Sequence, residues 1–221
     1  MIAIEDTVLI LLAAGRGSRF GDIGSKLAEP FLGRAVGLHV AVALEDMPFR
    51  RRIAVVGQTA LDYGAHGFDL VANDDPDQGM ARSVRLGVEQ ARLMDAAAVL
   101  IALADMPRIT AAHVWRLFDA ADSHDAVVAS SDGRAPKPPA LFGRRQFDFL
   151  LTLEGDAGAR DLVRRGRHVV TTPAELIDVD TPEELAALRA SVGAVHEIMH
   201  HQNVSDRSKP TVLSGESRNP G

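Results

Sequence analysis

A glycine-rich, positively charged segment follows the first apolar run of the chain, and its residue types are typical of a phosphate-binding loop. The run at residues 7–12 reads TVLILL, and the segment after it supplies, in order, Gly15, Arg16, Gly17, Arg19 and Lys26. Successive backbone N–H groups in a glycine-rich turn point together at an anion, and an arginine can bind two phosphate oxygens at once. We therefore expect this loop to hold the phosphates of a nucleoside triphosphate. The alternative is a solvated surface loop.

Two other nucleotide motifs do not match this segment. A P-loop requires the pattern GxxxxGK[ST], but residues 24–27 read GSKL. A dinucleotide-binding turn requires GxGxxG and a carboxylate at the end of the second strand. Here Gly21 comes one residue late, and the run at 52–56 is followed by Gly57. The sequence therefore disfavours both a P-loop and an NAD site.

Carboxylates at the ends of two further apolar segments are candidate metal ligands. Asp105 follows the run at 97–104, and Asp178 and Asp180 lie at the end of a shorter candidate strand at 176–179. Mg²⁺ usually takes one or two carboxylates together with substrate phosphate oxygens and water. We expect Asp105 to be one ligand and either Asp178 or Asp180 to be the second. The alternatives are a turn-forming aspartate at 105 and, at 180, a residue that only precedes a helix cap.

Apolar runs that alternate with amphipathic segments must position these groups. Continuous apolar runs predict strands at 7–12, 52–56, 68–72, 97–104, 126–129, 168–171 and 176–179. Helical spacing and capping residues predict helices at about 35–44, 79–94, 110–121, 144–151, 157–165 and 181–191. The three prolines of residues 132–139 cannot donate to a sheet, so a loop is predicted there. The pattern predicts an α/β fold with a mostly parallel sheet, whose ligands bind beyond the carboxyl ends of the strands.

Length and composition limit the class of protein. The 221 residues are 46% hydrophobic and 24% charged, as in an ordinary globular domain, which we expect over residues 1–195. Residues 196–221 are polar and predict a disordered tail. The absence of cysteine excludes disulfides and thiolate chemistry, and no apolar run approaches the ~20 residues of a membrane span. The net charge of −6 disfavours binding to nucleic acid or to an anionic membrane. Because residues 1–7 do not read as a signal peptide and no membrane span is found, we expect a cytoplasmic protein.

Six short segments occur in a fixed order over most of residues 7–190. They are LAAGRGSRFG at 12–21, Lys26, Asn73 with GMARSV at 79–84, ADMP at 104–107, GDAGAR at 155–160 and DVDTPEE at 178–184. Together they resemble the MobA-like nucleotidyltransferases, most closely the branch of molybdenum cofactor cytidylyltransferases. The chain departs from that family at 133–142, where a histidine or asparagine is replaced and extra prolines appear. A second departure at 21–24 slightly lengthens the phosphate loop.

The resemblance implies both a fold and a reaction. The fold is a three-layer Rossmann-like nucleotidyltransferase fold with a mostly parallel, mixed sheet. The reaction is a Mg²⁺-dependent transfer of a nucleotidyl group, CMP from CTP, to a phosphorylated small molecule, a molybdopterin-type cofactor, with release of pyrophosphate. The pair Ala13-Ala14 is associated in the family with CTP rather than GTP. A molybdoenzyme or its chaperone is an implied partner.

The same resemblance implies roles for individual residues. Lys26, Arg19 and Asp105 are the implied catalytic residues, and Asp105 and Asp180 are the implied Mg²⁺ ligands. The implied nucleotide-binding residues are Leu12, Ala13, Ala14, Gly15, Arg16, Gly17, Lys26, Asn73, Gly79, Ser83 and Asp105.

Three alternatives stay open at this point. One is a nucleotidyltransferase for another acceptor, such as a sugar or polyol phosphate. Another is a non-catalytic nucleotide-binding partner of a molybdoenzyme, which the presence of both Lys26 and Asp105 disfavours. The last is a glycosyltransferase that uses Asp178 and Asp180 as a DxD pair, although such a pair normally follows a strand in the middle of the chain.

Overall fold

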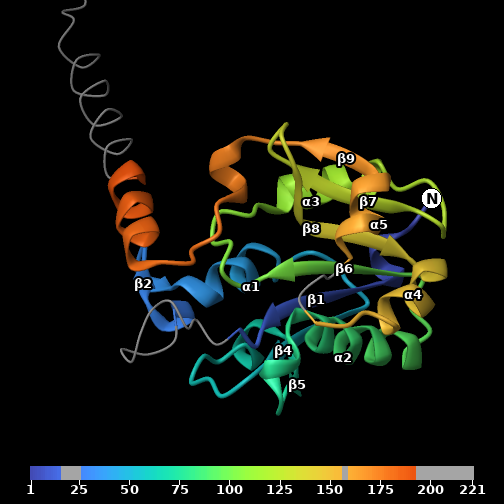
Figure 1. Ribbon diagram of the computed structural model, residues 1–221, viewed down its shortest axis with the longest axis horizontal. Coiled ribbons are helices and arrows are strands. Elements are labelled where there is room, and N and C mark those ends of the chain that lie inside the picture. Colours follow the sequence, from blue (N-terminus) through green and yellow to red (C-terminus); the bar gives the residue numbers. More distant parts are fainter. Residues whose placement is uncertain (16–25, 156–158, 193–221) are drawn as a thin grey trace, which may run out of the picture. The chain divides into compact units, whose positions relative to one another are not determined.

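The computed structural model describes residues 1–15, 26–155 and 159–192 of the chain (Figure 1). The chain divides into two compact units, Met1–Pro182 and Glu183–Gly221. The described part of the second unit, residues 183–192, is helical, as predicted for this segment. The tail predicted at 196–221 lies outside the described residues.

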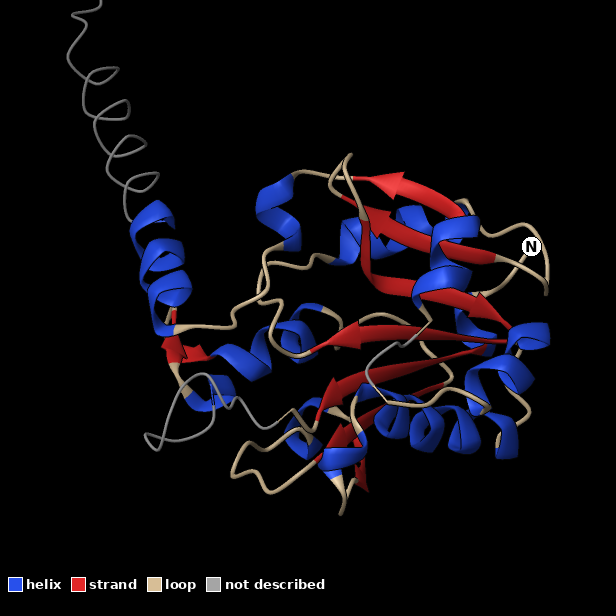
Figure 2. Cartoon of the chain, viewed as in Figure 1, coloured by secondary structure: helices blue, strands red, loops and turns tan. Residues whose placement is uncertain are grey.

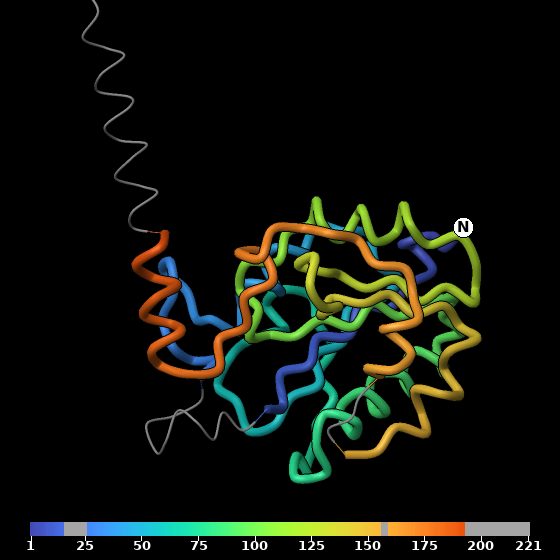
Figure 3. The backbone as a smooth tube through the Cα atoms, turned by 45° about the horizontal axis from the view of Figure 1, so that its top comes forward, coloured from blue at the N-terminus to red at the C-terminus, as the bar shows by residue number. Residues whose placement is uncertain are grey.

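The first unit is built on a seven-stranded mixed sheet. In spatial order its strands are β5 (Asp69–Ala72), β4 (Arg51–Val56), β1 (Thr7–Ala13), β6 (Ala98–Leu103), β8 (Pro136–Gly143), β7 (Val127–Ser131) and β9 (Arg167–Val170). Within this sheet β8 runs antiparallel to both of its neighbours, β6 and β7. The remaining pairs of neighbouring strands are all parallel. The central strands β1 and β6 run side by side in Figure 3. The predicted α/β fold with a mostly parallel sheet is confirmed.

Helices cover both faces of this sheet (Figure 2). The α-helices are α1 (His39–Ala43), α2 (Met80–Leu93), α3 (Ala111–Asp119), α4 (Phe147–Leu151) and α5 (Arg160–Arg165). Short 3₁₀ helices lie at Ile4–Asp6, Lys26–Ala28, Val36–Leu38, Gly64–His66, Pro76–Gln78, Arg144–Gln146 and Pro173–Leu176, and a separate two-stranded sheet pairs β2 (Pro30–Phe31) with β3 (Arg34–Ala35). Among the described residues, no helix is both long enough and apolar enough to pass through a lipid bilayer.

Strand β1 shows why the structure has three layers. Its seven residues are all buried, and successive side chains point to opposite faces of the sheet. Leu9 and Leu11 pack in the core that contains residues of α1 and α3, whereas Ile10 packs in the core that contains residues of α2 and α4. Gly87 lets α2 approach the sheet closely, because a Cβ at this position would lie 2.5 Å from Ile10 Cγ2.

The structure corrects two of the sequence-based expectations. The proline-rich segment predicted as a loop is partly strand, because β8 starts at Pro136 and pairs with β7 across an irregularity between Ala129 and Ser130. The strand predicted at 176–179 is absent. The 3₁₀ helix Pro173–Leu176 is followed there by chain without regular structure, and the Val179 N–H donates to the Asp105 carbonyl oxygen at 2.9 Å instead of to a neighbouring strand.

Candidate active site

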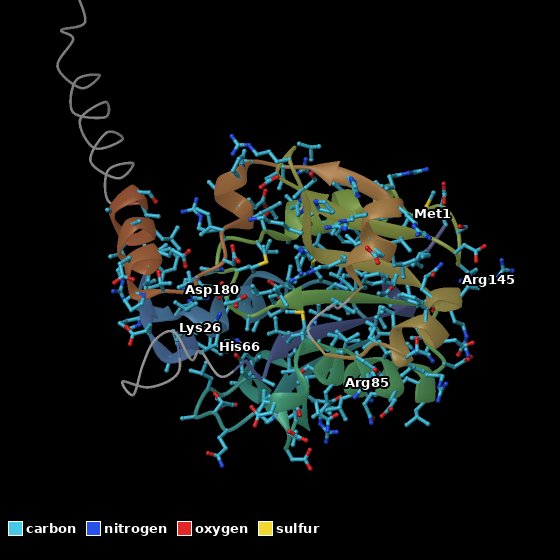
Figure 4. All side chains as sticks on the ribbon, in the orientation of Figure 1. Met1, Lys26, His66, Arg85, Arg145 and Asp180 are labelled. Atoms are coloured by element: carbon cyan, nitrogen blue, oxygen red, sulfur yellow. The ribbon has the colours of Figure 1, made fainter. Side chains whose placement is uncertain are left out.

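Three segments that are distant in the sequence bring a lysine and two carboxylates together at the carboxyl end of the central strands. Lys26 lies in a short 3₁₀ helix after β1, Asp105 follows β6, and Asp180 lies near the end of the first unit. The Lys26 ammonium donates to Asp105 Oδ2 at 2.5 Å and to Asp180 Oδ1 at 2.8 Å. Figure 4 shows Lys26 and Asp180 next to each other. The three side chains therefore form one charged cluster.

Burial controls the charges of this cluster. Burial lowers the pKa of Lys26, but the adjacent carboxylates of Asp105 and Asp180 outweigh this effect and raise that pKa above its usual value. The Lys26 side chain is therefore a cation. Burial also raises the pKa of Asp105, which the charge of Lys26 opposes and the charges of Asp180 and Asp178 reinforce. The ionised form of Asp105 depends on a cation held close to it.

The chemistry of the cluster fits a divalent metal ion. Asp105 Oδ1 is buried and accepts no hydrogen bond from the described residues. This oxygen lies in the same cluster as Asp105 Oδ2 and Asp180 Oδ1, which both accept from Lys26. The described part of the chain contains no group of three or more histidine, cysteine, aspartate or glutamate side chains that could hold a metal ion. Two carboxylates are enough for Mg²⁺ when substrate phosphates supply further ligands.

The second carboxylate beside Asp105 is Asp180 rather than Asp178. Asp180 contacts Lys26, whereas Asp178 Oδ1 lies 3.8 Å from the ammonium of Lys137. Between the two aspartates, the Val179 side chain is fully buried. This arrangement favours Asp180 as the partner of Asp105 in a metal site.

A cavity of 270 Å³ adjoins the cluster, and Lys26 and Asp105 line it. Each described residue that the sequence analysis implied in nucleotide binding lines it, namely Leu12, Ala13, Ala14, Gly15, Lys26, Asn73, Gly79, Ser83 and Asp105. Leu27, Pro76, Met80 and Leu103 complete the lining. Arg16, Gly17 and Arg19 lie outside the described residues, so their proposed contacts with phosphate stay predictions.

Buried hydrogen bonds fix the polar wall of this cavity. Asn73 Nδ2 donates to Ser83 Oγ at 3.0 Å, and the Asn73 backbone N–H donates to the Val56 carbonyl oxygen at 2.7 Å. Asn73 Oδ1 accepts from Arg82 Nε at 2.9 Å. Gly79, with a φ of 76°, turns the chain into α2 in a conformation that favours glycine. These contacts preorganise the wall before a ligand binds.

A second cavity of 640 Å³ adjoins the first one at Ala13, Ala14 and Gly15. It lies beyond the ends of β1, β4 and β5, and its polar lining includes Gln58 and Thr59. The sequence analysis missed these two residues. The available signal was their place directly after an apolar parallel strand, where ligands of such sheets bind.

A third cavity of 460 Å³ adjoins the first one on the other side and shares Leu12, Met80 and Leu103 with it. Its lining includes three cationic residues to which the sequence analysis gave no role, namely Lys137, Arg160 and Arg164. Arg160 ends the GDAGAR segment, and Lys137 lies in the departure from the family pattern at 133–142, which was predicted in part as a loop.

Comparison with known proteins places this geometry in a family. A family model described as the MobA-like NTP transferase domain matches residues 9–170. The purine catabolism protein PucB of Bacillus subtilis is 32% identical over 200 residues, which are 83% of this chain and 96% of PucB. A molybdenum cofactor guanylyltransferase of Cupriavidus metallidurans is 27% identical and covers 92% of this chain and 98% of its own length.

Solved structures agree on the fold. Rv0371c of Mycobacterium tuberculosis superposes with a TM-score of 0.72 at 23% identity, over 85% of this chain and 100% of that chain. A further structure of Rv0371c, in complex with manganese, has a TM-score of 0.69 and covers 84% of this chain and 98% of its own, also at 23% identity. The match of the family model and the identity to PucB go beyond fold. This chain belongs to the family of MobA-like NTP transferase domains, a nucleotidyltransferase family.

Proposed function

We propose that this protein transfers CMP from CTP to the phosphate of a molybdopterin-type cofactor and releases pyrophosphate, with Mg²⁺ held by Asp105 and Asp180. The observation that carries the proposal is the cluster of Lys26, Asp105 and Asp180, of which Lys26 and Asp105 line a cavity together with the implied nucleotide-binding residues. A protein that only binds a nucleotide has no need of a buried lysine between two carboxylates. The family assignment supports the same class of reaction.

The reaction is an in-line displacement at the α-phosphorus of the nucleotide. A phosphate oxygen of the acceptor forms the new bond to that phosphorus, the bond to the oxygen that bridges the α- and β-phosphates breaks, and pyrophosphate leaves with its electron pair. An acceptor phosphate is already ionised at neutral pH, so no side chain has to remove a proton. Catalysis then consists of positioning and charge stabilisation.

The residues of the cluster divide this work. Lys26 binds the α-phosphate and stabilises the negative charge that grows there. Asp105 and Asp180 hold a divalent cation, which neutralises phosphate charge when it is bound. Arg16 and Arg19, in the loop after β1, bind the β- and γ-phosphates. In the ligand-free protein the carboxylates keep Lys26 charged and in place, so substrate phosphates replace existing oxygen partners rather than ordering a loose side chain.

The two substrates are proposed on different grounds. The base is proposed from Ala13-Ala14, because both residues line the catalytic cavity and the 640 Å³ cavity beside it. The acceptor is proposed from the relatives, one of which is a molybdenum cofactor guanylyltransferase. A molybdoenzyme or its chaperone would then receive the product. The manganese complex of Rv0371c supports the use of a divalent metal.

A second candidate function is nucleotidyl transfer to a sugar or polyol phosphate. The observation in its favour is the departure from the family pattern at 133–142, because part of that segment lines the cavity beside the catalytic one. The chemistry at the α-phosphorus is the same in both cases, so acceptor assays separate the two candidates.

Pyrophosphate release tests the proposal. The purified protein receives Mg²⁺ with CTP or GTP, and each mixture contains molybdopterin, glucose 1-phosphate or no acceptor. We expect pyrophosphate only when CTP and molybdopterin are both present. Release with glucose 1-phosphate alone would replace the acceptor, and no release with any triphosphate and acceptor would exclude catalysis in favour of a binding role.

A further inference from the structure

A tyrosine hydroxyl is buried in the core without a hydrogen-bond partner among the described residues. Tyr63 is the only tyrosine of the sequence, and its side chain is fully buried. Its Oη is one of the few buried polar side-chain atoms that the described part of the chain leaves unpaired. A buried hydroxyl normally has a partner, because an unpaired one is costly. Phenylalanine would fill the same space without this cost, so the hydroxyl itself requires an explanation.

The chain around Tyr63 leaves room for this hydroxyl next to the segment that carries Lys26. A Cβ at Gly37 would lie 2.8 Å from Tyr63 Oη and 2.9 Å from Leu27 Cβ. The hydroxyl and Leu27 therefore both pack against Gly37, and Leu27 directly follows Lys26 in the sequence. Any larger residue at position 37 would displace the hydroxyl from this place.

The same core also contains the two sequence neighbours of Asp105. Tyr63 belongs to the hydrophobic cluster that includes Ala104 and Met106, and all three side chains are buried. The Tyr63 phenol therefore lies on the core side of the residues that hold Lys26 and Asp105.

Backbone and ring contacts fix the phenol in this position. The Tyr63 carbonyl oxygen accepts from the backbone N–H groups of His66 at 3.1 Å and Phe68 at 3.3 Å. Its ring packs edge-on against the Phe68 ring, with the ring centroids 6.4 Å apart. The hydroxyl is thus held in place before any ligand binds.

Asp105 offers an unpaired acceptor to match this unpaired donor. Its Oδ2 accepts from Lys26, whereas the buried Oδ1 has no partner among the described residues. Burial raises the pKa of the Tyr63 phenol above its usual value near 10, and the negative charge of Asp105 raises it further. The phenol therefore keeps its proton and remains a donor, and the charge of Asp105 acts on it.

The inference drawn from these observations rests on the proposed function, in which substrate phosphates replace the carboxylates as partners of Lys26. We propose that Tyr63 is a positioning residue whose hydroxyl donates to Asp105 Oδ1, directly or through one water, and orients this carboxylate for a divalent metal ion. When Lys26 turns to the α-phosphate, Asp105 Oδ2 loses its donor, and the hydrogen bond from Tyr63 then keeps the carboxylate in place. Carboxylates that bind metals are commonly held by such a second hydrogen bond.

Metal affinity tests this role without catalysis. The probe is Mn²⁺, whose binding is measured by electron paramagnetic resonance with CTP present and without an acceptor. The variants are Tyr63→Phe, which removes only the hydroxyl, and the control Phe68→Leu. The control disturbs the packing of the Tyr63 ring but retains its hydroxyl.

We expect Tyr63→Phe to bind Mn²⁺ at least about tenfold more weakly than the wild type, the loss that follows removal of a group that holds a metal ligand. The affinity for CTP without metal should not change, because Tyr63 lines neither the 270 Å³ nor the 640 Å³ cavity. Phe68→Leu should lower the melting temperature and leave the Mn²⁺ affinity unchanged. A Tyr63→Phe variant with wild-type Mn²⁺ affinity overturns the proposal.

The single tyrosine also provides a spectroscopic signature of the hydrogen bond. Protein labelled with ¹³C at the tyrosine Cζ gives one resonance, because the sequence contains no second tyrosine. We expect Asp105→Asn to shift this resonance. The control Asp62→Asn, at an exposed aspartate directly before Tyr63, should leave it in place. A resonance that does not respond to Asp105→Asn also overturns the proposal.

The two measurements separate this inference from the proposed function. If CTP and Mn²⁺ bind the wild type and Tyr63→Phe equally well, the role of Tyr63 is wrong and the metal site stands. If the wild type binds neither CTP nor Mn²⁺, the proposed function fails. The Tyr63 resonance then still decides whether the hydroxyl bonds to Asp105.

Discussion

The two sides of the sheet's centre differ in how they build a site. On one side, the parallel strands β5, β4, β1 and β6 end in loops whose side chains and backbone form the cluster of Lys26 and Asp105 and the 640 Å³ cavity. On the other side, the antiparallel strand β8 passes along the 460 Å³ cavity, and side chains of β8 and α5 form part of the lining of that cavity. The first site is made at strand ends, and the second along the length of a strand.

This difference has a physical consequence for specificity. Residues after parallel strands meet at one edge of a sheet whatever the details of packing, so the nucleotide side depends mainly on local motifs. Which side chains of β8 face the cavity depends instead on its register with β6 and β7, which pairs Ile101 with Ala140 and Ser130 with Lys137. The lining of the 460 Å³ cavity can therefore change through strand residues without any change at the catalytic cluster.

The largest effect should come from Asp105→Asn. The amide has nearly the same shape but no charge, so it is a poor ligand for Mg²⁺ and leaves Lys26 with one carboxylate. We expect pyrophosphate release to fall by about 10²–10³, the effect of removing one preorganised charged contact. Steady-state kinetics measure the loss. Circular dichroism should show a folded protein, because the backbone bond from Val179 to Asp105 does not involve the side chain.

The outcome of this substitution also tests the assignment of the cluster. Turnover within threefold of the wild type would remove Asp105 from the catalytic centre.

A matched pair of substitutions, Asp180→Asn and Asp178→Asn, should give the next largest effect. Asp180 contacts Lys26 beside Asp105, so we expect its loss to lower turnover by about 10². The Asp178 side chain is 52% exposed, and its ion pair with a described residue is a long one, 3.8 Å to Lys137, so its loss should change turnover less than about fivefold. Turnover numbers at saturating CTP and acceptor decide between them. The reverse order of effects would assign the metal to Asp178.

The choice of base should follow, with a smaller effect. We expect kcat/KM for CTP to exceed that for GTP by at least about tenfold, the discrimination that differences of one or a few atoms in a shaped site produce. The reason is the Ala13-Ala14 pair, whose methyl groups line the cavity beside the cluster and narrow it. Both triphosphates are compared with the same acceptor. Equal or reversed values would contradict the base assignment and leave the fold untouched.

The comparison of the two sides also explains what could be predicted from the sequence. Strands β1 and β6 are continuous apolar runs, and Asn73 and Asp105 come within two residues of strand ends, so composition and position located them. Lys26 lies thirteen residues after β1, and its role was located by the family motif alone. Lys137 was missed because its flanking prolines suggested a loop, whereas β8 admits them beside the irregularity in its pairing with β7. The absence of a strand at 176–179 was missed for a similar reason, because a buried Val179 that bonds to the turn at Asp105 has the same apolar signature as a strand residue.

The smallest expected effect concerns a buried histidine that supports β8. His113 on α3 contacts Ser130 Oγ at 2.7 Å through Nε2, and the Ser130 hydroxyl donates to the Pro139 carbonyl oxygen at 2.8 Å. Because the serine has only one proton, Nε2 must be the donor to it. Arg116 donates to His113 Nδ1 at 2.9 Å. The ring is therefore neutral, with its proton on Nε2, and through Ser130 it anchors β8 at Pro139.

This arrangement predicts a stability that decreases in mild acid. Burial lowers the pKa of His113 below its usual value near 6.5, Glu175 opposes this shift, and Arg116 adds to it. Below about pH 6.5 the unfolded chain therefore binds a proton at this histidine, whereas the folded chain does not. The contribution of His113 to the free energy of unfolding is complete above that pH and is lost as the pH falls toward the pKa of the folded state. Each group of this kind can contribute up to about 1.4 kcal/mol per pH unit, which is a few degrees of melting temperature for a chain of this size.

Melting temperatures between pH 7.5 and 5.5 should fall less steeply for His113→Gln than for the wild type. The melting temperature of the exposed control His124→Gln should fall as steeply as that of the wild type. If the slope for His113→Gln also equals the wild-type slope, His113 is protonated in the folded protein.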